Sequence, residues 1–266
     1  MERYQTEADT LAHYDAKQYP TPDGYTSDIA VFSIIAEELP EHTKKPPKRT
    51  LKIMLIKRAA CDNEGNANIE GGKWALPGGF IQPDETAYEA AKRELQEEAG
   101  VSGLHLKHFN VYDKPGRDPR GWIISNAHYA IVPEHQLDKR KAADDAAEVE
   151  LFDMEEAFAL ELAFDHRQII QDALAFIKRD MIQTTVARNF LPQEFTLSEL
   201  QGVLLAAVSD PAIQSSPVFF DKAPKLRFIE LVIGNDGKPK TSNRYSYRPA
   251  KLYRFNEAEP VFNVYK

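Results

Sequence analysis

Continuous apolar runs alternate with polar stretches along the first two-thirds of the chain. The runs at residues 28–35 and 51–57 are rich in β-branched side chains, and this pattern predicts two buried strands. Shorter runs of the same kind predict further strands near residues 74–76, 106–112, 122–132 and 147–152. The polar stretches between the runs are expected to form exposed loops.

One stretch in this region carries the start and stop signals of a helix. Thr86 and Glu89 have the spacing of a capping box, and Gly100 stands where a left-handed C-terminal glycine is typical. These signals predict a helix over residues 87–99, and a second helix is expected over residues 165–180. Strands mixed with helices predict an α/β (α+β) layered domain with a mixed sheet.

Beyond residue 180 helical patterns take over from the strands. Thr196 and Glu199 form a second capping box, and an apolar residue recurs at helical spacing after it. Leu226, Ile229 and Ile233 are spaced i, i+3 and i+7, which predicts another helix. A polar turn and an alternating strand follow. Helix, turn, helix and basic hairpin is the order of a winged helix.

The length of 266 residues is large for one core, so two domains are expected. We place the first at residues 1–180 and a small winged-helix-like domain at residues 181–266. No apolar run approaches the roughly 20 residues that cross a bilayer, which excludes a membrane partner. The polar N-terminus and the single cysteine, Cys61, are typical of a cytoplasmic protein.

The formal net charge of −8 is unevenly distributed. Residues 1–180 hold 22 Lys and Arg against 33 Asp and Glu, whereas residues 181–266 hold 11 against 8. A basic segment on an acidic body indicates either a nucleic-acid surface or a solvated basic face. The candidates for DNA contacts are Lys222, Lys225, Arg227, Lys238, Lys240, Arg244 and Arg248.

The stretch with the most specific chemistry, residues 79–101, reads GFIQPDETAYEAAKRELQEEAGV. It fits the pattern G-x5-E-x7-R-E-U-x-E-E-x-G-U, where U is apolar, at every position. Leu95 and Val101 fill the apolar positions. The fixed positions are filled by Gly79, Glu85, Arg93, Glu94, Glu97, Glu98 and Gly100. This stretch resembles the box of the Nudix hydrolase family. The resemblance implies an α/β/α sandwich and cleavage of a nucleoside diphosphate compound.

Three carboxylates of the box share one face of the predicted helix. Glu94, Glu97 and Glu98 are spaced i, i+3 and i+4, so their side chains lie together and repel one another. A hard divalent cation, Mg²⁺ or Mn²⁺, relieves such repulsion and takes oxygen ligands. A solvated acidic face is the alternative. Leu95 and Tyr88 lie further round the helix and are expected to anchor it in the core.

The resemblance also implies roles for the box residues. The expected metal ligands are Glu94, Glu97, Glu98 and a backbone carbonyl near Gly79. The metal polarises the diphosphate and activates water near neutral pH. Glu85 and Arg93 are expected to pair and to fix the loop against the helix, and Glu85 is a further candidate for a metal contact. The general base is left open between the box glutamates and a later loop.

Three further segments narrow the choice of substrate. Residues 115–125 (PGRDPRGWIIS) and 162–170 (LAFDHRQII) resemble segments of Nudix proteins that handle ADP-ribose. Residues 14–32 resemble the start of Nudix-related regulators of NAD metabolism, which carry a C-terminal winged helix and release DNA on binding ADP-ribose. The resemblance therefore implies ADP-ribose, double-stranded DNA and a second copy of the chain, as a homodimer, as partners.

Four residues in these segments are candidates for substrate binding. Arg117 and Arg120 offer planar, multi-donor cations to phosphates, although Asp118 lies close enough in sequence to pair with them. Asp165 and His166 stand at the expected start of a helix, where capping is the alternative to a role with substrate.

Three functions are consistent with these features. The first is Mg²⁺-dependent hydrolysis of ADP-ribose to AMP and ribose 5-phosphate, by an enzyme that can also double as an ADP-ribose-responsive DNA-binding regulator. The second is a catalytically silent repressor that senses ADP-ribose. The third is hydrolysis of another nucleotide, with the C-terminal domain serving dimerisation. The intact box favours retained catalysis, because a pure sensor has no need of three metal carboxylates. Few cations precede the hairpin, so any DNA binding is expected to be weak and salt-sensitive.

Overall fold

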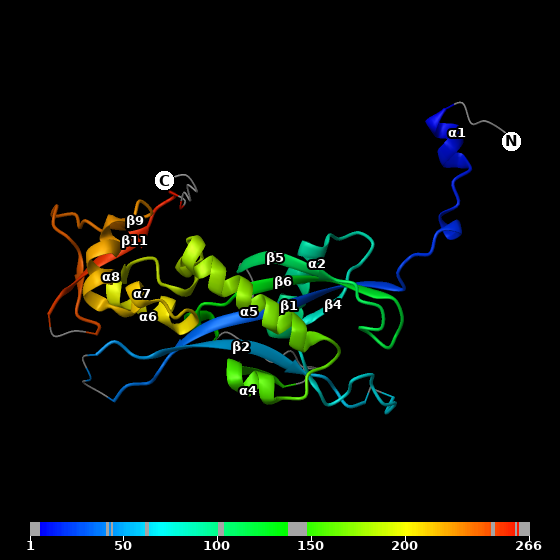
Figure 1. The fold of residues 1–266 in the computed structure, drawn as a ribbon, viewed down its shortest axis with the longest axis horizontal. Coiled ribbons are helices and arrows are strands. Elements are labelled where there is room, and N and C mark those ends of the chain that lie inside the picture. Colours follow the sequence, from blue (N-terminus) through cyan, green and yellow to red (C-terminus); the bar gives the residue numbers. More distant parts are fainter. Residues whose placement is uncertain are drawn as a thin grey trace.

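The computed structural model describes residues 6–40, 43, 45–61, 64–100, 104–137, 148–245, 248–258 and 260. The strands of its larger sheet are β1 (Gly24–Ala36), β2 (Arg49–Lys57), β3 (Trp74–Ala75), β4 (Gly78–Phe80), β5 (His105–Tyr112), β6 (Ile123–Ile131) and β7 (Val149–Asp153). Their order is β3-β2-β1-β6-β5, with β4 beside β1 and β7 beside β2 (Figure 1). Strands β1 and β6 pair in parallel and the other described pairs are antiparallel, which confirms a mixed sheet.

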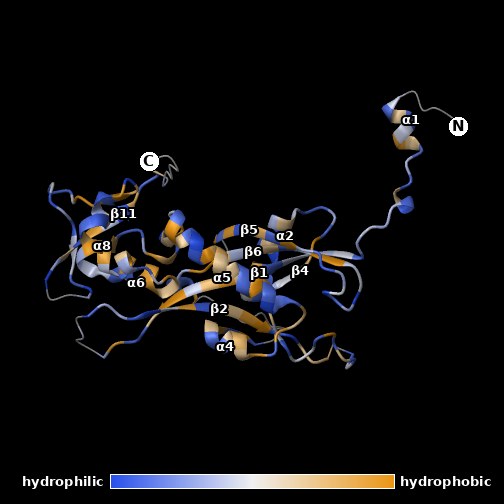
Figure 2. Cartoon of the chain, viewed as in Figure 1, coloured by the Kyte–Doolittle hydropathy of each residue, from blue (hydrophilic) through white to orange (hydrophobic). Residues whose placement is uncertain are grey.

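Helices cover both faces of this sheet. Side chains of a strand alternate between its two faces; accordingly Val31 lies in a buried cluster with helix α2 (Ala87–Ala99), whereas Phe32 lies in a second cluster with α5 (His166–Gln183). Figure 2 shows the apolar residues concentrated in the sheet strands and on helix surfaces against it. The two short helices of this part are α3 (Glu134–Leu137) and α4 (Met154–Ala159). The arrangement is the predicted α/β/α sandwich.

The N-terminal segment projects away from the sheet (Figure 1). It contains α1 (Glu7–Ala12) and the 3-10 turn η1 (Ala16–Gln18). Its large apolar side chains are exposed, including Leu11, Tyr14 and Tyr19. The two tyrosine rings stack on each other rather than on the body of the protein.

A second, smaller sheet lies at the other end of the molecule (Figure 1). Its elements, in chain order with the helices between them, are η2 (Val186–Phe190), β8 (Phe195–Thr196), α6 (Leu197–Ala207), α7 (Pro211–Gln214), α8 (Ser216–Lys222), η3 (Ala223–Lys225), β9 (Ile229–Leu231), β10 (Thr241–Ser242) and β11 (Ala250–Phe255). Strand β11 pairs antiparallel with each of β8, β9 and β10. The predicted capping box at the start of α6 is confirmed, with Glu199 and Thr196 bonded to each other's backbone N–H.

The helix predicted from Leu226, Ile229 and Ile233 is wrong. Ile229 is buried in strand β9, whereas Leu226 and Ile233 are 40% and 52% exposed, so the three residues do not form one buried stripe. The helix that precedes this stretch is α8, which ends before the tight turn at Pro224. Pairing with β11 supplies the backbone hydrogen bonds that a helix over these residues would have made internally.

Helix α5 joins the two parts of the chain. It runs across residue 180, and its buried side chains belong to one apolar cluster with residues of both sheets. The domain division at residues 180 and 181 stays a prediction. No helix of the described chain is long and apolar enough to cross a membrane.

Candidate functional site

Helix α2 is held at both ends as the sequence predicts. The Thr86 hydroxyl accepts from the Glu89 N–H and the Glu89 carboxylate accepts from the Thr86 N–H, while Gly100 adopts the left-handed conformation with φ 64°. Leu95 is buried, as predicted. The prediction that Tyr88 anchors the helix is wrong, because Tyr88 is 43% exposed and the small Ala91 packs against the sheet instead. Val101 lies outside the described residues.

Arg93 contacts more residues of the box than a single ion pair would require. Its guanidinium donates to both oxygens of Glu85, from Nη2 over 2.7 Å and from Nε over 3.1 Å. The same side chain donates to Glu94 over 2.7 Å, to Glu97 over 3.1 Å and to the Phe80 carbonyl over 3.1 Å. The hydrogen bonds to Glu85 raise the pKa of Arg93 above its usual value, against partial burial. The expected Glu85–Arg93 pair is present and ties the loop after β4 to α2.

The glycines before the helix touch the box carboxylates. The Gly78 N–H donates to the Glu98 carboxylate over 2.8 Å. Burial raises the pKa of Glu98 to about 7 and, against the pull of Arg93, also raises the pKa of Glu94 above its ordinary value. A Cβ on Gly79 would lie 2.2 Å from Glu94 Oε1, so any larger residue here would displace this carboxylate.

The oxygen atoms of the box are the kind of ligand that Mg²⁺ and Mn²⁺ prefer. The donor set consists of three carboxylates, one of them packed against a glycine backbone whose carbonyl is a further oxygen donor. Among the described residues, however, no three His, Cys, Asp or Glu side chains are gathered in metal-binding geometry. Glu94 and Glu97 are turned to Arg93, and Glu98 to Gly78. The residues therefore fit a metal if Glu94 and Glu97 exchange the guanidinium for the cation.

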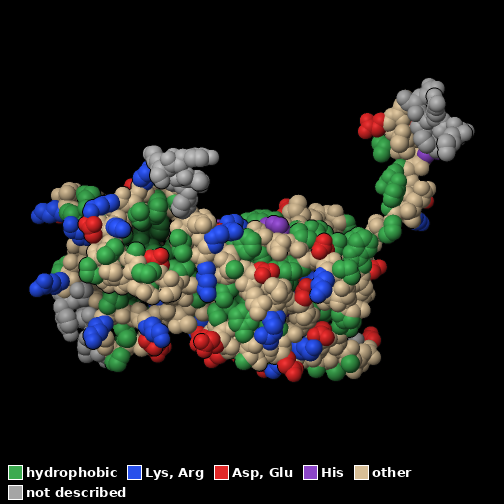
Figure 3. Space-filling view, in the orientation of Figure 1, with side chains coloured by type: hydrophobic (Ala, Val, Ile, Leu, Met, Phe, Trp, Pro, Cys, Tyr) green, Lys and Arg blue, Asp and Glu red, His purple; other side chains and the backbone are tan. Residues whose placement is uncertain are grey.

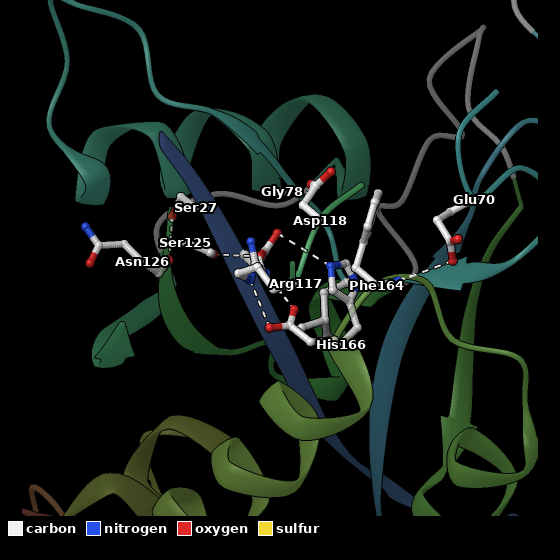
Figure 4. Close-up of polar contacts among 12 residues, drawn as sticks. Ser27, Glu70, Gly78, Arg117, Asp118, Ser125, Asn126, Phe164 and His166 are labelled. Atoms are coloured by element: carbon white, nitrogen blue, oxygen red, sulfur yellow. Dashed lines mark hydrogen bonds and ion pairs between the residues drawn. The ribbon is translucent and has the colours of Figure 1, made fainter. Parts of the chain in front are cut away.

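A cleft of about 60 Å³ opens beside these glycines. It is lined by residues of β1, of the ends of β2 and β4, of the loop between β5 and β6, and of the start of α5. Figure 4 shows Arg117, Asp118, Phe164 and His166 together near Gly78. The cleft thus brings Arg117, Arg120 and His166, three of the four predicted substrate residues, into one lining.

Arg117 is buried and bound by carboxylates. It donates to Asp165 from Nε over 2.9 Å and from Nη2 over 2.6 Å, and Nη2 lies 3.4 Å from Asp28. Asp28 also accepts from the Ser125 hydroxyl over 2.6 Å. Asp165 occupies the N-cap position of α5 but makes no side-chain cap. Its carboxylate positions Arg117 instead, so the capping alternative does not hold for this side chain.

Arg120 lies between two aromatic rings at the cleft. Its guanidinium carbon is 5.0 Å from the centre of the Phe80 ring and 5.2 Å from that of Phe164. It also donates to both oxygens of Asp118, the pairing that the sequence left open. Stacking and pairing hold the planar guanidinium in one orientation at the rim of the cleft.

His166 is fully enclosed at the start of α5. Its Nδ1 accepts from the Leu76 N–H over 2.9 Å, and its Nε2 lies 3.8 Å from Asp28. Burial lowers the pKa of His166 below its ordinary value, which keeps the ring neutral. The side chain therefore fixes the end of β3 to α5, a structural role next to the cleft.

Sequence reasoning missed Arg58, which follows β2 and lines the cleft. Its guanidinium carbon lies 5.2 Å from the Phe164 ring, on which Arg120 also stacks. Burial and the neighbouring Arg120 cation lower the pKa of Arg58. Phe164 itself has a positive φ of 50°, a rare conformation for a large side chain. No local motif marks Arg58, because only the sheet order brings the end of β2 to this cleft.

The predicted DNA-binding residues lie on the C-terminal elements, where Figure 3 shows Lys and Arg side chains gathered at the left. Several are tied to carboxylates: Lys225 to Asp221 over 2.6 Å, Lys240 to Glu194 over 2.8 Å and Arg244 to Glu199 over 2.8 Å. The remaining predicted residues are Lys222, Arg227, Lys238 and Arg248, and all four side chains are exposed.

Comparison with known proteins agrees with this architecture. A family model described as NUDIX domain matches residues 29–173. The chain is 28% identical over 263 residues to the ADPR responsive transcriptional repressor NtrR of Acinetobacter baylyi, a match that covers 98% of this chain and 92% of that protein.

Two further relatives cover different shares of the chain. The ADP-ribose pyrophosphatase of Methanocaldococcus jannaschii is 43% identical over 121 residues, which is 46% of this chain and 64% of that protein, so the match spans less than two-thirds of the relative. The structure of Shewanella oneidensis NrtR complexed with a 27mer DNA is 25% identical with a TM-score of 0.64. That match covers 87% of this chain and 93% of the other, and so includes the C-terminal elements.

Proposed function

This chain belongs to the Nudix family, and from that premise we propose that it binds ADP-ribose in the cleft beside α2 and hydrolyses the diphosphate with a divalent metal. One observation carries the proposal. Gly78 and Gly79 line the arginine cleft and also touch the carboxylates of Glu98 and Glu94. A diphosphate held by the arginines therefore lies directly beside the metal-binding face.

The arginines bind and orient the diphosphate. Arg120 is already held flat between Phe80 and Phe164, so little conformational entropy is lost when Nη1, which Asp118 does not engage, meets a phosphate. Within the described residues Arg58 makes no salt bridge and donates from Nε to the Ile69 carbonyl, so its terminal nitrogens can bind an anionic ligand. The cleft is far smaller than the roughly 300–1,000 Å³ of typical ligand pockets, so ADP-ribose must also spread over the open rim beside it.

Glu94, Glu97, Glu98 and the backbone carbonyl near Gly79 would hold the metal. When bound, it neutralises phosphate charge and makes water a nucleophile near neutral pH. The two bonds from Arg93 to Glu85 do not involve Glu94 or Glu97, so they would hold the loop in place if those two carboxylates took up a cation. Water adds to one phosphorus, the bridging P–O bond breaks, and AMP and ribose 5-phosphate leave.

The test is a product assay on the full chain with ADP-ribose and Mg²⁺ or Mn²⁺. AMP and ribose 5-phosphate are expected from wild type, while Glu97→Gln loses turnover and still binds ADP-ribose. The matched control is Glu155→Gln, an exposed glutamate on α4 that lies outside the cleft. Binding of ADP-ribose without turnover in wild type would support the silent sensor, and turnover of another nucleotide in its place would support the third hypothesis.

A second function is favoured by the C-terminal elements. The elements run in the order β8, α6, α7, α8, η3, β9, β10 and β11, and a basic segment lies between β9 and β11. Helices followed by a basic hairpin support the interpretation of this part as a winged helix. We propose that this part binds double-stranded DNA and that ADP-ribose weakens the complex. The full-length likeness to the repressor NtrR supports this proposal. The basic loop would hold phosphates, while α8, with a single basic residue in its last turn, contributes few charges.

The DNA proposal is tested by fluorescence anisotropy on promoter DNA from the gene's own neighbourhood. We expect a complex at low salt that ADP-ribose reverses. Lys238→Gln should lower the salt dependence of log affinity by about one unit for one phosphate contact. Lys178→Gln, at an exposed position of α5, serves as the control. The same samples test the predicted homodimer by light scattering. If no complex with DNA forms at low salt, the DNA proposal is wrong, and dimerisation is the remaining function for the C-terminal elements.

A further inference from the structure

A second cavity, lined mainly by apolar side chains, lies away from the nucleotide cleft. It has a volume of about 500 Å³ and opens between the end of α5 and the helices and strands of the second sheet. Side chains from α5, α6, α8 and β11 form its walls, among them Met181, Leu204, Phe219 and Phe255. Its volume falls within the range of about 300–1,000 Å³ that is typical of small-molecule sites.

Large apolar side chains at this cavity remain in contact with solvent. Ile182 is 55% exposed and Leu226 is 40% exposed, and both line the opening. The Phe228 and Phe255 rings stack with centres 6.1 Å apart and form a flat wall. Burying exposed apolar surface is favourable because it removes that surface from water. A ligand that fills this concave opening is therefore stabilised by the hydrophobic effect.

The polar groups at the cavity are almost all of one kind. Lys222, Lys225 and Arg227 line it, and no acidic residue does. Lys225 is paired with Asp221, but within the described chain no salt bridge joins a carboxylate to Lys222 or Arg227. Thr184 is the one neutral polar side chain in the lining, and its hydroxyl already donates to the Asp180 carbonyl.

We propose that this cavity binds an amphipathic carboxylate: an aliphatic chain on the apolar walls and an anionic head at Lys222 and Arg227. A nucleotide or sugar does not fit, because its many polar atoms would lose water and find few partners on these walls. A ligand with all its charge at one end matches the lining, since the cations lie in one short stretch that starts at the last residue of α8. The proposal is independent of the function assigned to the α2 cleft.

The proposal is tested on the full chain with dansyl-labelled undecanoic acid, whose fluorescence rises in an apolar site. We expect saturable binding that dodecanoate displaces and that dodecanol, its uncharged analogue, displaces at least tenfold less well. The double variant Lys222→Gln with Arg227→Gln should bind the probe about tenfold more weakly, which corresponds to about 1.4 kcal/mol. Lys251→Gln, an exposed cation of β11 outside the lining, should bind like wild type.

A steric variant tests the position of the chain. Ala212 is exposed on α7 and lines the cavity, so Ala212→Trp fills it without disturbing buried packing and should abolish displaceable fluorescence. Gln214→Trp places the same ring on the same short helix outside the lining and should leave binding intact. Unsaturable binding, equal displacement by dodecanol, or unchanged binding by folded Ala212→Trp would each overturn the proposal. Thermal unfolding of each variant establishes that it is folded.

Discussion

The backbone N–H of Gly78 donates to the carboxylate of Glu98 over 2.8 Å, which ties the turn after β3 to the last turn of α2. Gly78 has a φ of +156°, and a Cβ there would lie 2.3 Å from the Ser27 carbonyl oxygen. The turn therefore passes closely between β1 and α2. This close passage is what places the arginine cleft and the acidic face of α2 next to each other.

Gly79→Ala is expected to abolish most of the proposed activity while the fold survives. The added Cβ would lie 2.2 Å from Glu94 Oε1, so the carboxylate must move from its place beside the backbone. A displacement of about 1 Å at a reacting centre can cost about a hundredfold in rate, and we expect a loss of that order in kcat/KM. Gly65→Ala adds its Cβ in open space away from the box, and although its φ of +86° strains the loop locally, it should retain activity. Full activity of Gly79→Ala would contradict the assigned role of this carboxylate.

Arg93→Lys should destabilise the box before any ligand is added. Lysine keeps the charge but loses the forked contact with Glu85 and the bonds to the Phe80 carbonyl and Glu94. Because the side chain is a quarter exposed, we expect a modest drop of about 1–2 kcal/mol in the free energy of unfolding. Urea denaturation measures it, with exposed Lys92→Gln as the neighbouring control. An unchanged midpoint would show that the network is dispensable.

Arg58→Gln and Arg120→Gln should weaken ADP-ribose binding more than they slow the chemical step. Each removes one forked cation from the cleft, and a charge-assisted hydrogen bond contributes about 1.5–3 kcal/mol. We expect KM to rise about tenfold or more for each variant, with a smaller change in kcat. Steady-state kinetics separates the two effects. If Arg58→Gln leaves KM unchanged, the diphosphate does not contact this side of the cleft.

Asp180 should make stability depend on pH in the acid range. Burial alone would raise the pKa of Asp180, but hydrogen bonds from Lys107 and Tyr129, each over 2.6 Å, hold it below its ordinary value. This stabilisation is present above the unfolded pKa of about 3.9 and is lost as the pH falls through the lower folded value. Wild type should therefore lose stability below about pH 4.

Asp180→Asn isolates this contribution. The variant should be less stable than wild type near neutral pH by about 1–3 kcal/mol, the usual cost of a broken buried charged network. It should also show a shallower decline in the acid range. Urea unfolding between pH 3 and 7 measures both effects. Parallel pH profiles for the two proteins would mean that another group governs acid unfolding.

The sequence predicts well whatever depends on local spacing. The capping boxes at Thr86 and Thr196 and the left-handed Gly100 are set by residues within one or two turns, and all three are present. The pairing of Arg93 with Glu85 follows from the box pattern and is also present. These features need no knowledge of the tertiary fold.

Features that depend on contacts between residues far apart in the chain could not be predicted from the sequence. Arg58 reaches the cleft because of the strand order, and its neighbour Phe164 comes from more than a hundred residues later in the chain. The apolar spacing at Leu226 and Ile233 suits a helix, yet pairing with β11 makes a strand between them. Asp165 has the sequence position of a cap but is bound by Arg117 instead.

The central claim is that the acidic face of α2 and the adjoining arginine cleft act as one catalytic site for ADP-ribose. The most direct measurement is the release of AMP from ADP-ribose by the full chain, with and without Mg²⁺, in wild type and Glu97→Gln. The account predicts metal-dependent release by wild type that is lost in Glu97→Gln while ADP-ribose still binds. No release by wild type with either Mg²⁺ or Mn²⁺, or equal release by Glu97→Gln, would contradict it.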